Sequence, residues 1–269
     1  MNNLKFSYFN SLINNIDIDI LDHGHILADA SWKHYCISSP FNRLYFVIDG
    51  EGFVYNNRQA ITLSGGNAYL IPANTEFNYV CDSYLEKFYI HFRAELFHGF
   101  DMFESLDTCM TSPLSPLNLQ YLMEKVKSEK AGDIIFCKAY LLQTVAAFED
   151  MLSQSRDLQF NMACKYRNIF KYLKTNCHAG ITIKELADCS GLTASSFSKN
   201  FKKDMGLTVK EYMEKSLAHR AKEKLLLTDK LVKEIAYELK FSDEFYFSRF
   251  FKRLTGLSPK DYRLKNQVL

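Results

Sequence analysis

The sequence predicts a protein of two folded parts: a β-barrel or sandwich followed by helices, and then an all-α domain made of two copies of one helical motif. Three observations support this class. The first half holds many short β-rich segments that end at glycine or asparagine turns. The second half repeats one pattern of residues at a nearly constant offset. Charge also divides the chain, because residues 1–160 carry 11 basic and 19 acidic side chains, whereas residues 161–269 carry 22 and 12.

Residues from about 5 to 95 contain the strand segments. The segment 44–48 is rich in β-forming residues and ends at Asp49-Gly50, a turn dipeptide, so we expect a new strand to begin at Gly52. Similar segments cover 60–63, 69–72, 77–80 and 85–92. Many short strands with regular turn signals are typical of a sandwich or barrel. We therefore expect a barrel over residues 1–105.

Two amphipathic helices are expected after the barrel, over 116–130 and 133–153. We interpret residues 106–153 as a helical dimerisation segment, with the alternative that these helices only cover their own barrel. The polar stretch 154–161 is the expected linker, and 162–269 the second domain.

The first helical unit spans about 181–205. Thr182 is a plausible N-cap, with Glu185 three residues later as its capping-box partner. Gly191 suits a tight turn because glycine reaches positive φ cheaply. Thr193 can then cap a second helix over 194–205, whose residues Phe197 and Phe201 lie four apart on its buried side. This arrangement is a helix-turn-helix, the motif that places its second helix in the major groove of DNA.

The second unit spans about 231–255 and repeats the first. Its opening Lys-Glu-Ile-Ala is offset by 49 residues and its buried pair, Phe247 and Phe251, by 50. Between the units, residues 209–227 contain no Gly or Pro and predict one continuous connecting helix. At ~1.5 Å per residue this helix spans ~27 Å. One turn of DNA is ~34 Å, so the connector suits two adjacent major-groove windows.

The second unit resembles the signature of the AraC/XylS family of bacterial transcription regulators. The matching residues are Glu234-Ile235-Ala236, Phe241, Phe247 to Arg253, Gly256, Ser258-Pro259 and Tyr262-Arg263. The resemblance covers about 100 residues from Tyr166 onward. It implies a homodimer that binds promoter DNA, contacts RNA polymerase and usually activates transcription. One residue departs from the pattern, since Lys240 stands where the family usually has Gly. Either that turn differs or Lys240 contacts a phosphate.

The resemblance also implies which residues contact DNA. Base contacts are expected from the exposed positions of the two recognition helices: Ser195, Ser198, Lys199, Glu244, Phe245, Ser248 and Arg249. Arginine and lysine reach guanine acceptors, glutamate accepts from cytosine, and an apolar ring packs on a thymine methyl. Phosphate contacts, which position a protein without reading sequence, are expected from Lys202, Lys203, Lys240, Lys252 and Arg253. Phe245 could instead pack inward.

The glycine turns Gly50-Glu51-Gly52 and Gly65-Gly66, with Leu70-Ile71-Pro72, make the first domain similar to a cupin, a jelly-roll barrel. Cupin enzymes often hold a metal with an HxH pair, and the only such pair, His23 and His25, precedes the glycine turns. We therefore expect no metal and no cofactor. A small-molecule effector, for example a sugar, is expected in the barrel mouth. The candidate effector-binding residues are Trp32, His34, Arg43, Tyr45, Tyr79 and His91.

Other functions are less consistent with the sequence. A cupin isomerase or oxygenase would need the missing metal ligands, so we expect no catalytic residues. A regulator without an effector, controlled by a protein partner or by its abundance, stays open. The seven cysteines form no CxxC pair, which indicates reduced, mostly buried thiols. The opening Met1–Leu4 does not begin a signal peptide, and no run of about 18 apolar residues predicts a membrane span. We expect a cytoplasmic protein.

Overall fold

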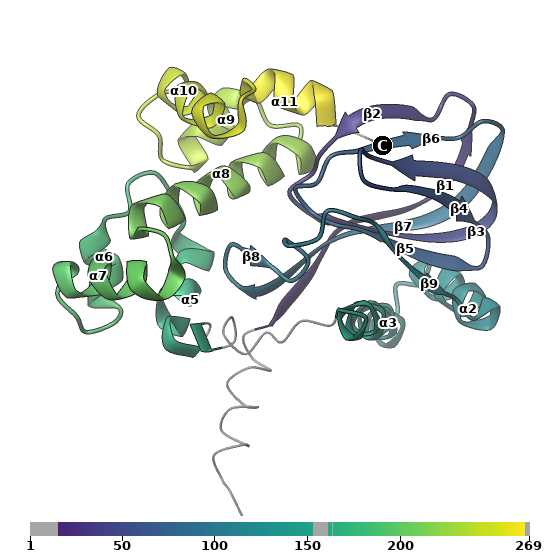
Figure 1. Cartoon of the computed structure of the whole chain (residues 1–269), viewed down its shortest axis with the longest axis horizontal. Coiled ribbons are helices and arrows are strands. Elements are labelled where there is room, and N and C mark those ends of the chain that lie inside the picture. The colour runs from purple at the N-terminus through teal and green to yellow at the C-terminus, as the bar shows by residue number, and fades with distance from the viewer. Residues whose placement is uncertain (1–15, 153–160, 163, 267–269) are drawn as a thin grey trace, which may run out of the picture.

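The computed structural model describes residues 16–152, 161–162 and 164–266. Its N-terminal part, the β-domain (Asp17–Pro113), is a twisted antiparallel sheet folded on itself (Figure 1). One path of strands runs β1-β7-β3-β5-β9, while β4 and β6 pair with β3, β2 with β6, and β8 with β7. The strand bounds are β1 Asp17–Asp29, β2 Lys33–Ile37, β3 Asn42–Tyr55, β4 Ala60–Ser64, β5 Asn67–Ile71, β6 Phe77–Val80, β7 Tyr84–Phe97, β8 Phe100–Asp101 and β9 Met110–Pro113.

Strand β3 corrects one prediction, because it does not end at Asp49-Gly50. Its first part pairs with β5 and β7, and its second part pairs with β4 and β6. The register with β7 shifts between Val47 and Asp49, and Gly50 has a φ of 79°. The dipeptide therefore marks a bulge that bends one long strand between two layers, rather than a hairpin turn. The strands also continue past residue 105, since β9 pairs with β5.

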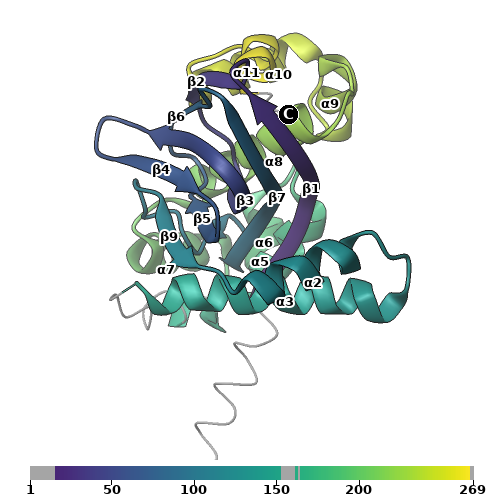
Figure 2. The ribbon, with the colours of Figure 1, turned by 90° about the vertical axis from the view of Figure 1, so that its right-hand side faces the viewer.

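The sheet has two apolar faces that serve different cores. The inner face gathers Trp32, Tyr45, Tyr79 and Leu85 in the interior of the β-domain. The outer face, with Phe46, Phe88 and Phe92, is covered by two helices that lie beneath the sheet (Figure 2). These are α2, Pro116–Val126, and α3, Ala131–Asp150. The expected linker falls mostly outside the described residues.

Helix α3 buries only one side. Leu141, Val145 and Phe148 pack on the sheet, whereas Ile134 and Ile135 are 58% and 68% exposed. Among the described residues it alone has the length and mean hydropathy, 1.3, that could suit a membrane span. A single helix of this kind is weak evidence for a span, and the buried side of α3 shows it packed on protein.

The helical domain follows the predicted units closely. Thr182 forms the expected capping box with Glu185, and Thr193 accepts a hydrogen bond from the Ser196 N–H. The connector, α8, is continuous and is capped by a second box between Thr208 and Glu211. The helix bounds are α5 Arg167–Asn176, α6 Ile183–Asp188, α7 Ala194–Met205, α8 Val209–Leu227, α9 Val232–Glu238, α10 Glu244–Thr255 and α11 Pro259–Asn266. No disulfide bond joins any of the seven cysteines, all of which lie in the described part of the chain; three are buried, three partly buried, and Cys36 is exposed.

The β-domain and the helical domain pack against each other along α8 (Figure 1). The rings of Phe100 and Tyr212 stack with centroids 5.9 Å apart, and the Tyr212 hydroxyl donates to the carbonyl of His98. At the other end of the interface, the Ser38 N–H donates to Asn266 Oδ1 of α11 at 2.8 Å. Contacts at both ends therefore join the two domains.

Candidate nucleic-acid interface and ligand site

The second helix of the first unit, α7, separates an apolar side from a polar one. Phe197 and Phe201 are fully buried against Tyr166 and Tyr212. On the opposite side, Ser195 and Lys199 are exposed, and Ser198 is partly exposed. The Ser198 hydroxyl donates to the Ala194 carbonyl at 2.7 Å, so it needs no other partner to be satisfied. The result is a small, polar and basic surface that a groove can approach.

Helix α10 of the second unit repeats this division. Phe247 and Phe251 are fully buried, whereas Phe245 is 70% exposed and so does not pack inward. Arg249 is exposed, and Glu244 and Ser248 are partly exposed. Asp243 caps the helix by accepting from the Tyr246 N–H at 2.6 Å. That hydrogen bond, helped by the charge of Arg249, lowers the pKa of the Asp243 carboxyl, so the cap stays ionised.

The predicted phosphate-contacting cations divide into free and paired groups. Lys202, Lys203 and Lys252 are exposed near the ends of the recognition helices. Arg253 instead forms an ion pair with Glu214 of α8, with Nη1 3.1 Å from Oε2. Arg253 therefore ties α10 to the connector, and contacting a phosphate would require it to share or leave that carboxylate.

Lys240 occupies the turn between α9 and α10 in the left-handed region. Its φ is 56°, and Gly191, 49 residues earlier in the first unit, has a φ of 66°. The two turns thus have the same backbone form, although one lacks glycine. This result excludes the alternative that the turn of the second unit has a different backbone conformation. The exposed Lys240 side chain remains available for a phosphate.

The six effector-binding candidates lie together at the inner face of the β-domain. The ring of Trp32 contacts those of His34 and Tyr79, with centroids 6.1 and 5.9 Å apart. Arg43 donates to the Tyr79 hydroxyl at 3.2 Å. The rings of Tyr45 and Tyr79 lie 6.4 Å apart. One central residue was missed, Lys87, whose Nζ lies between the rings of Trp32 and Tyr45.

His91 forms the edge of this group. Its ring stacks on Phe41 with centroids 4.9 Å apart, and its Nδ1 lies 3.5 Å from Asp22 Oδ2. Burial lowers the pKa of His91 to about 4, because the favourable contact with Asp22 does not offset desolvation. The imidazole is therefore neutral at neutral pH.

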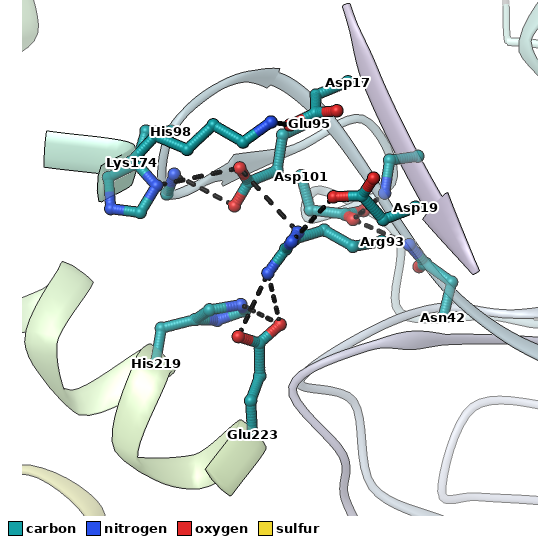
Figure 3. Close-up of polar contacts among 12 residues, drawn as sticks. Asp17, Asp19, Asn42, Arg93, Glu95, His98, Asp101, Lys174, His219 and Glu223 are labelled. Carbon is teal, nitrogen blue, oxygen red and sulfur yellow. Dashed lines mark hydrogen bonds and ion pairs between the residues drawn. The ribbon is translucent and has the colours of Figure 1, made fainter. Parts of the chain in front are cut away.

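A set of charged residues, which we call the interdomain cluster, joins β1 and β7 to α8 (Figure 3). Arg93 is at its centre, with Nη1 2.8 and 3.0 Å from the two carboxylate oxygens of Glu223. Its Nη2 donates to Asp19 at 2.8 Å. The cluster consists of Asp19, Arg93, Glu95, His98, His219 and Glu223.

Several groups of the interdomain cluster have perturbed ionisation. Burial raises the pKa of Glu95 to about 7, although Arg93 opposes the shift. Burial lowers the pKa of His98 to about 4, and the charges of His219 and Arg93 add to that effect. A cavity of about 250 Å³ is lined by five of these residues together with Lys174, Arg220 and Lys224. The interface thus contains one carboxyl, that of Glu95, whose pKa lies near neutral pH.

No group of three or more His, Cys, Asp or Glu side chains in the described part of the chain could hold a metal ion. Neither His23 nor His25 belongs to a group of potential metal ligands of this size. The His23 ring contacts Phe88, and His25 pairs with Glu86.

Comparison with known proteins adds a family match and several relatives. A family described as a helix-turn-helix domain matches residues 186–265. The HTH-type transcriptional activator Btr of Bacillus subtilis (strain 168) is 25% identical over 216 residues, covering 77% of this chain and 41% of that protein. The lactose operon transcription activator of Staphylococcus xylosus is 25% identical over 143 residues, covering 53% and 51%. The chain thus spans about half or less of these two relatives.

Two further comparisons extend over nearly the whole chain. The Msm operon regulatory protein of Streptococcus mutans serotype c is 22% identical over 269 residues, covering 95% of each protein. The crystal structure of ToxT from Vibrio cholerae matches with a TM-score of 0.51 and 12% identity, covering 92% of this chain and 99% of that one. At such low identity the structural match shows a shared fold: an antiparallel β-sheet domain, helices, and a C-terminal helix-turn-helix domain.

Proposed function

Because the chain belongs to the AraC family of helix-turn-helix transcription regulators, we propose that it binds promoter DNA through α7 and α10 and activates transcription. The observation that carries this proposal is the pair of exposed polar faces on α7 and α10, held by one continuous helix. The first part of α8 belongs to the core of the first unit, and its second part to the core of the second. A rigid connector of this kind holds two recognition helices at a set spacing.

The base contacts in this proposal come from the exposed side of each recognition helix. On α7 they are Ser195, Ser198 and Lys199, and on α10 they are Glu244, Phe245, Ser248 and Arg249. The lysines around them would contact phosphates and give most of the salt-dependent affinity. Such a protein is a regulator and not an enzyme, and RNA polymerase would be its partner at the promoter.

The test is selection of genomic DNA fragments by the purified protein at moderate salt, followed by sequencing. We expect enrichment of a motif with two short windows about one helical turn apart. Enrichment that depends only on fragment length or charge would contradict sequence-specific binding.

We further propose that the protein is a homodimer and that α3 forms the interface. Support comes from the exposed apolar residues Ile134, Ile135 and Leu142, which no part of the described chain covers. Isologous pairing of two such helices would bury these side chains.

An effector in the β-domain would act on DNA binding through the contacts between the domains. The interdomain cluster and the Ser38–Asn266 hydrogen bond would transmit its presence to α8 and α11. A ligand shifts this equilibrium only if it binds the two arrangements with different affinity. The alternative, a regulator without an effector, would suit a β-domain whose inner face serves only as a core.

A further inference from the structure

Two cations are buried at the inner face of the β-domain without an anionic partner. Lys87 and Arg43 are each 2% exposed. Among the described residues, no carboxylate lies within ion-pair distance of either, and the Asp22 carboxylate at the edge of this face lies 3.5 Å from Nδ1 of the neutral His91. Burying an unpaired charge is costly, so such groups are rarely kept in a core without a function.

The surroundings of Lys87 stabilise a cation only weakly. Its Nζ lies 3.9 Å from the ring centroid of Trp32 and 3.6 Å from that of Tyr45. Ring faces attract a cation but accept no strong hydrogen bond, and an ammonium has three donors. Burial, and then the charge of Arg43, lower the pKa of Lys87 well below its ordinary value. A bound anion would raise this pKa again, because it stabilises the charged ammonium.

Arg43 has only neutral partners. Its two terminal nitrogens donate to the Tyr79 hydroxyl and to Ser39 Oγ, and its Nε has no partner among the described residues. A guanidinium normally matches a carboxylate, which accepts two parallel hydrogen bonds. The charge of Arg43 also affects the pKa values of His34, His91 and Tyr45, so all three lie within its field.

We propose that this inner face binds the carboxylate of a small organic acid, with Lys87 and Arg43 as its ligands and the rings of Trp32 and Tyr45 beside its body. The proposal deepens the effector part of the proposed function and rests on it. A neutral sugar would leave both charges uncompensated, whereas a carboxylate would pair with both and satisfy the open donors.

The contacts of Arg43 also connect a bound anion to the helical domain. Arg43 donates to Ser39, and the neighbouring Ser38 N–H donates to Asn266 of α11. Asn266 is 3% exposed and donates back to the Tyr262 carbonyl at 2.9 Å. An anion that draws Arg43 away from Ser39 would therefore act on the segment that holds α11. The predicted result is altered placement of the second helix-turn-helix unit.

The experiment measures thermal unfolding of the full chain with matched probes. Benzoate, phenylacetate and hexanoate are each compared with their amides, beside inorganic phosphate and lactose. We expect at least one carboxylate to raise Tm by about 2 °C or more, and its amide to have no effect. Lys87→Met should abolish this shift, while Lys33→Met, which changes an exposed lysine of β2, should keep it. If Lys87→Met does not fold, the comparison of each acid with its amide on the wild-type protein still tests whether the carboxylate is required.

Each other outcome overturns the proposal that an organic acid binds here. Equal shifts by acid and amide, a full shift in Lys87→Met, or no shift with any carboxylate would do so. A shift by phosphate alone would mean that a compact inorganic anion binds, not an organic acid. A shift by lactose in both wild type and Lys87→Met would leave an effector-responsive regulator with a neutral ligand. Sequence-specific DNA binding, measured separately without probes, decides the proposed function independently.

Discussion

At the scale of single residues, variants of Arg249 and Lys252 distinguish sequence-specific base contacts from nonspecific electrostatic attraction to DNA. Arg249 lies on the exposed side of α10, where its guanidinium can donate two hydrogen bonds to guanine O6 and N7. We expect Arg249→Ala to weaken binding to the selected operator by roughly 1–3 kcal/mol and to relax preference at one base pair. Competition titrations against single-base variants of the operator measure both effects. Unchanged affinity would remove Arg249 from the base-contacting set.

Lys252→Ala is the matched comparison, since Lys252 lies one helical turn further along the same helix and is also exposed. A phosphate contact carries no sequence information, so we expect the variant to weaken all DNA by a similar factor. The slope of log affinity against log salt should fall by about 1. A loss confined to one operator base pair would contradict a phosphate-contacting role.

Glu95 makes the interdomain cluster sensitive to pH. Arg93 on β7, His98 just after that strand, and His219 and Glu223 on α8 face this carboxyl, whose pKa rises to about 7 on folding. A raised folded pKa means that the stabilisation is present below 4.5, the ordinary value, and is lost as pH rises through 7. We expect the stability of wild type minus that of Glu95→Gln to fall by on the order of 3 kcal/mol across this window. Urea titrations at several pH values measure it, and a flat difference would exclude Glu95 as the titrating group.

At the scale of elements, the turn between α9 and α10 retains a strained residue. Lys240 has a φ of 56°, whereas the equivalent residue of the first unit is glycine. We expect Lys240→Gly to stabilise the helical domain by roughly 1 kcal/mol, because glycine adopts this conformation without a Cβ clash. If Lys240 also contacts a phosphate, the same variant should bind all DNA less tightly. Denaturant unfolding and DNA titration check the two effects, and a less stable variant would mean that the side chain stabilises the turn.

The elements that local sequence determines were predicted well. Caps such as Thr182 with Glu185 depend on residues three apart, so the start of α6 could be read directly from the chain. The continuous α8 was predicted for the same kind of reason, as its residues include no helix breaker. Strand β3 was not, because Asp49-Gly50 is compatible with either a hairpin or a bulge. Pairing with β7, more than 30 residues away, decides between them.

Site residues that depend on distant packing could be predicted only in part. The aromatic and basic candidates of the β-domain were identified by type, and they do lie together. Lys87 was missed, although the alternation of Leu85, Lys87 and Tyr89 along one strand could have indicated an inward lysine. Arg93 and Glu223 are 130 residues apart, and no local pattern connects them. Their pairing follows from how the two domains dock.

At the scale of the whole molecule, the parts form a chain of contacts from the β-domain to DNA. Arg43 at the inner face of the β-domain donates to Ser39, and the neighbouring Ser38 bonds to α11, while Arg93 reaches α8. Helix α8 contributes to the cores of both helix-turn-helix units. A rearrangement at either contact would therefore change the relative placement of α7 and α10. Dimerisation through α3 would leave these contacts intact, because α3 packs on the opposite part of the sheet (Figure 2).

Dimerisation can be tested without disturbing either core, because Ile135 is 68% exposed on α3. We expect Ile135→Glu to convert a dimer to a monomer in sedimentation velocity, with its Tm nearly unchanged at low concentration. Ala147→Glu adds the same charge at an exposed position of α3, on the side of the helix away from Ile134, Ile135 and Leu142, and should stay dimeric. Two linked DNA-binding domains gain affinity on paired operators because the second binding event is intramolecular. Ile135→Glu should therefore lose affinity about 10-fold or more for paired sites and keep its affinity for a single site. A dimeric Ile135→Glu variant would place the interface elsewhere, and a monomeric wild type would mean that one subunit binds its operator alone.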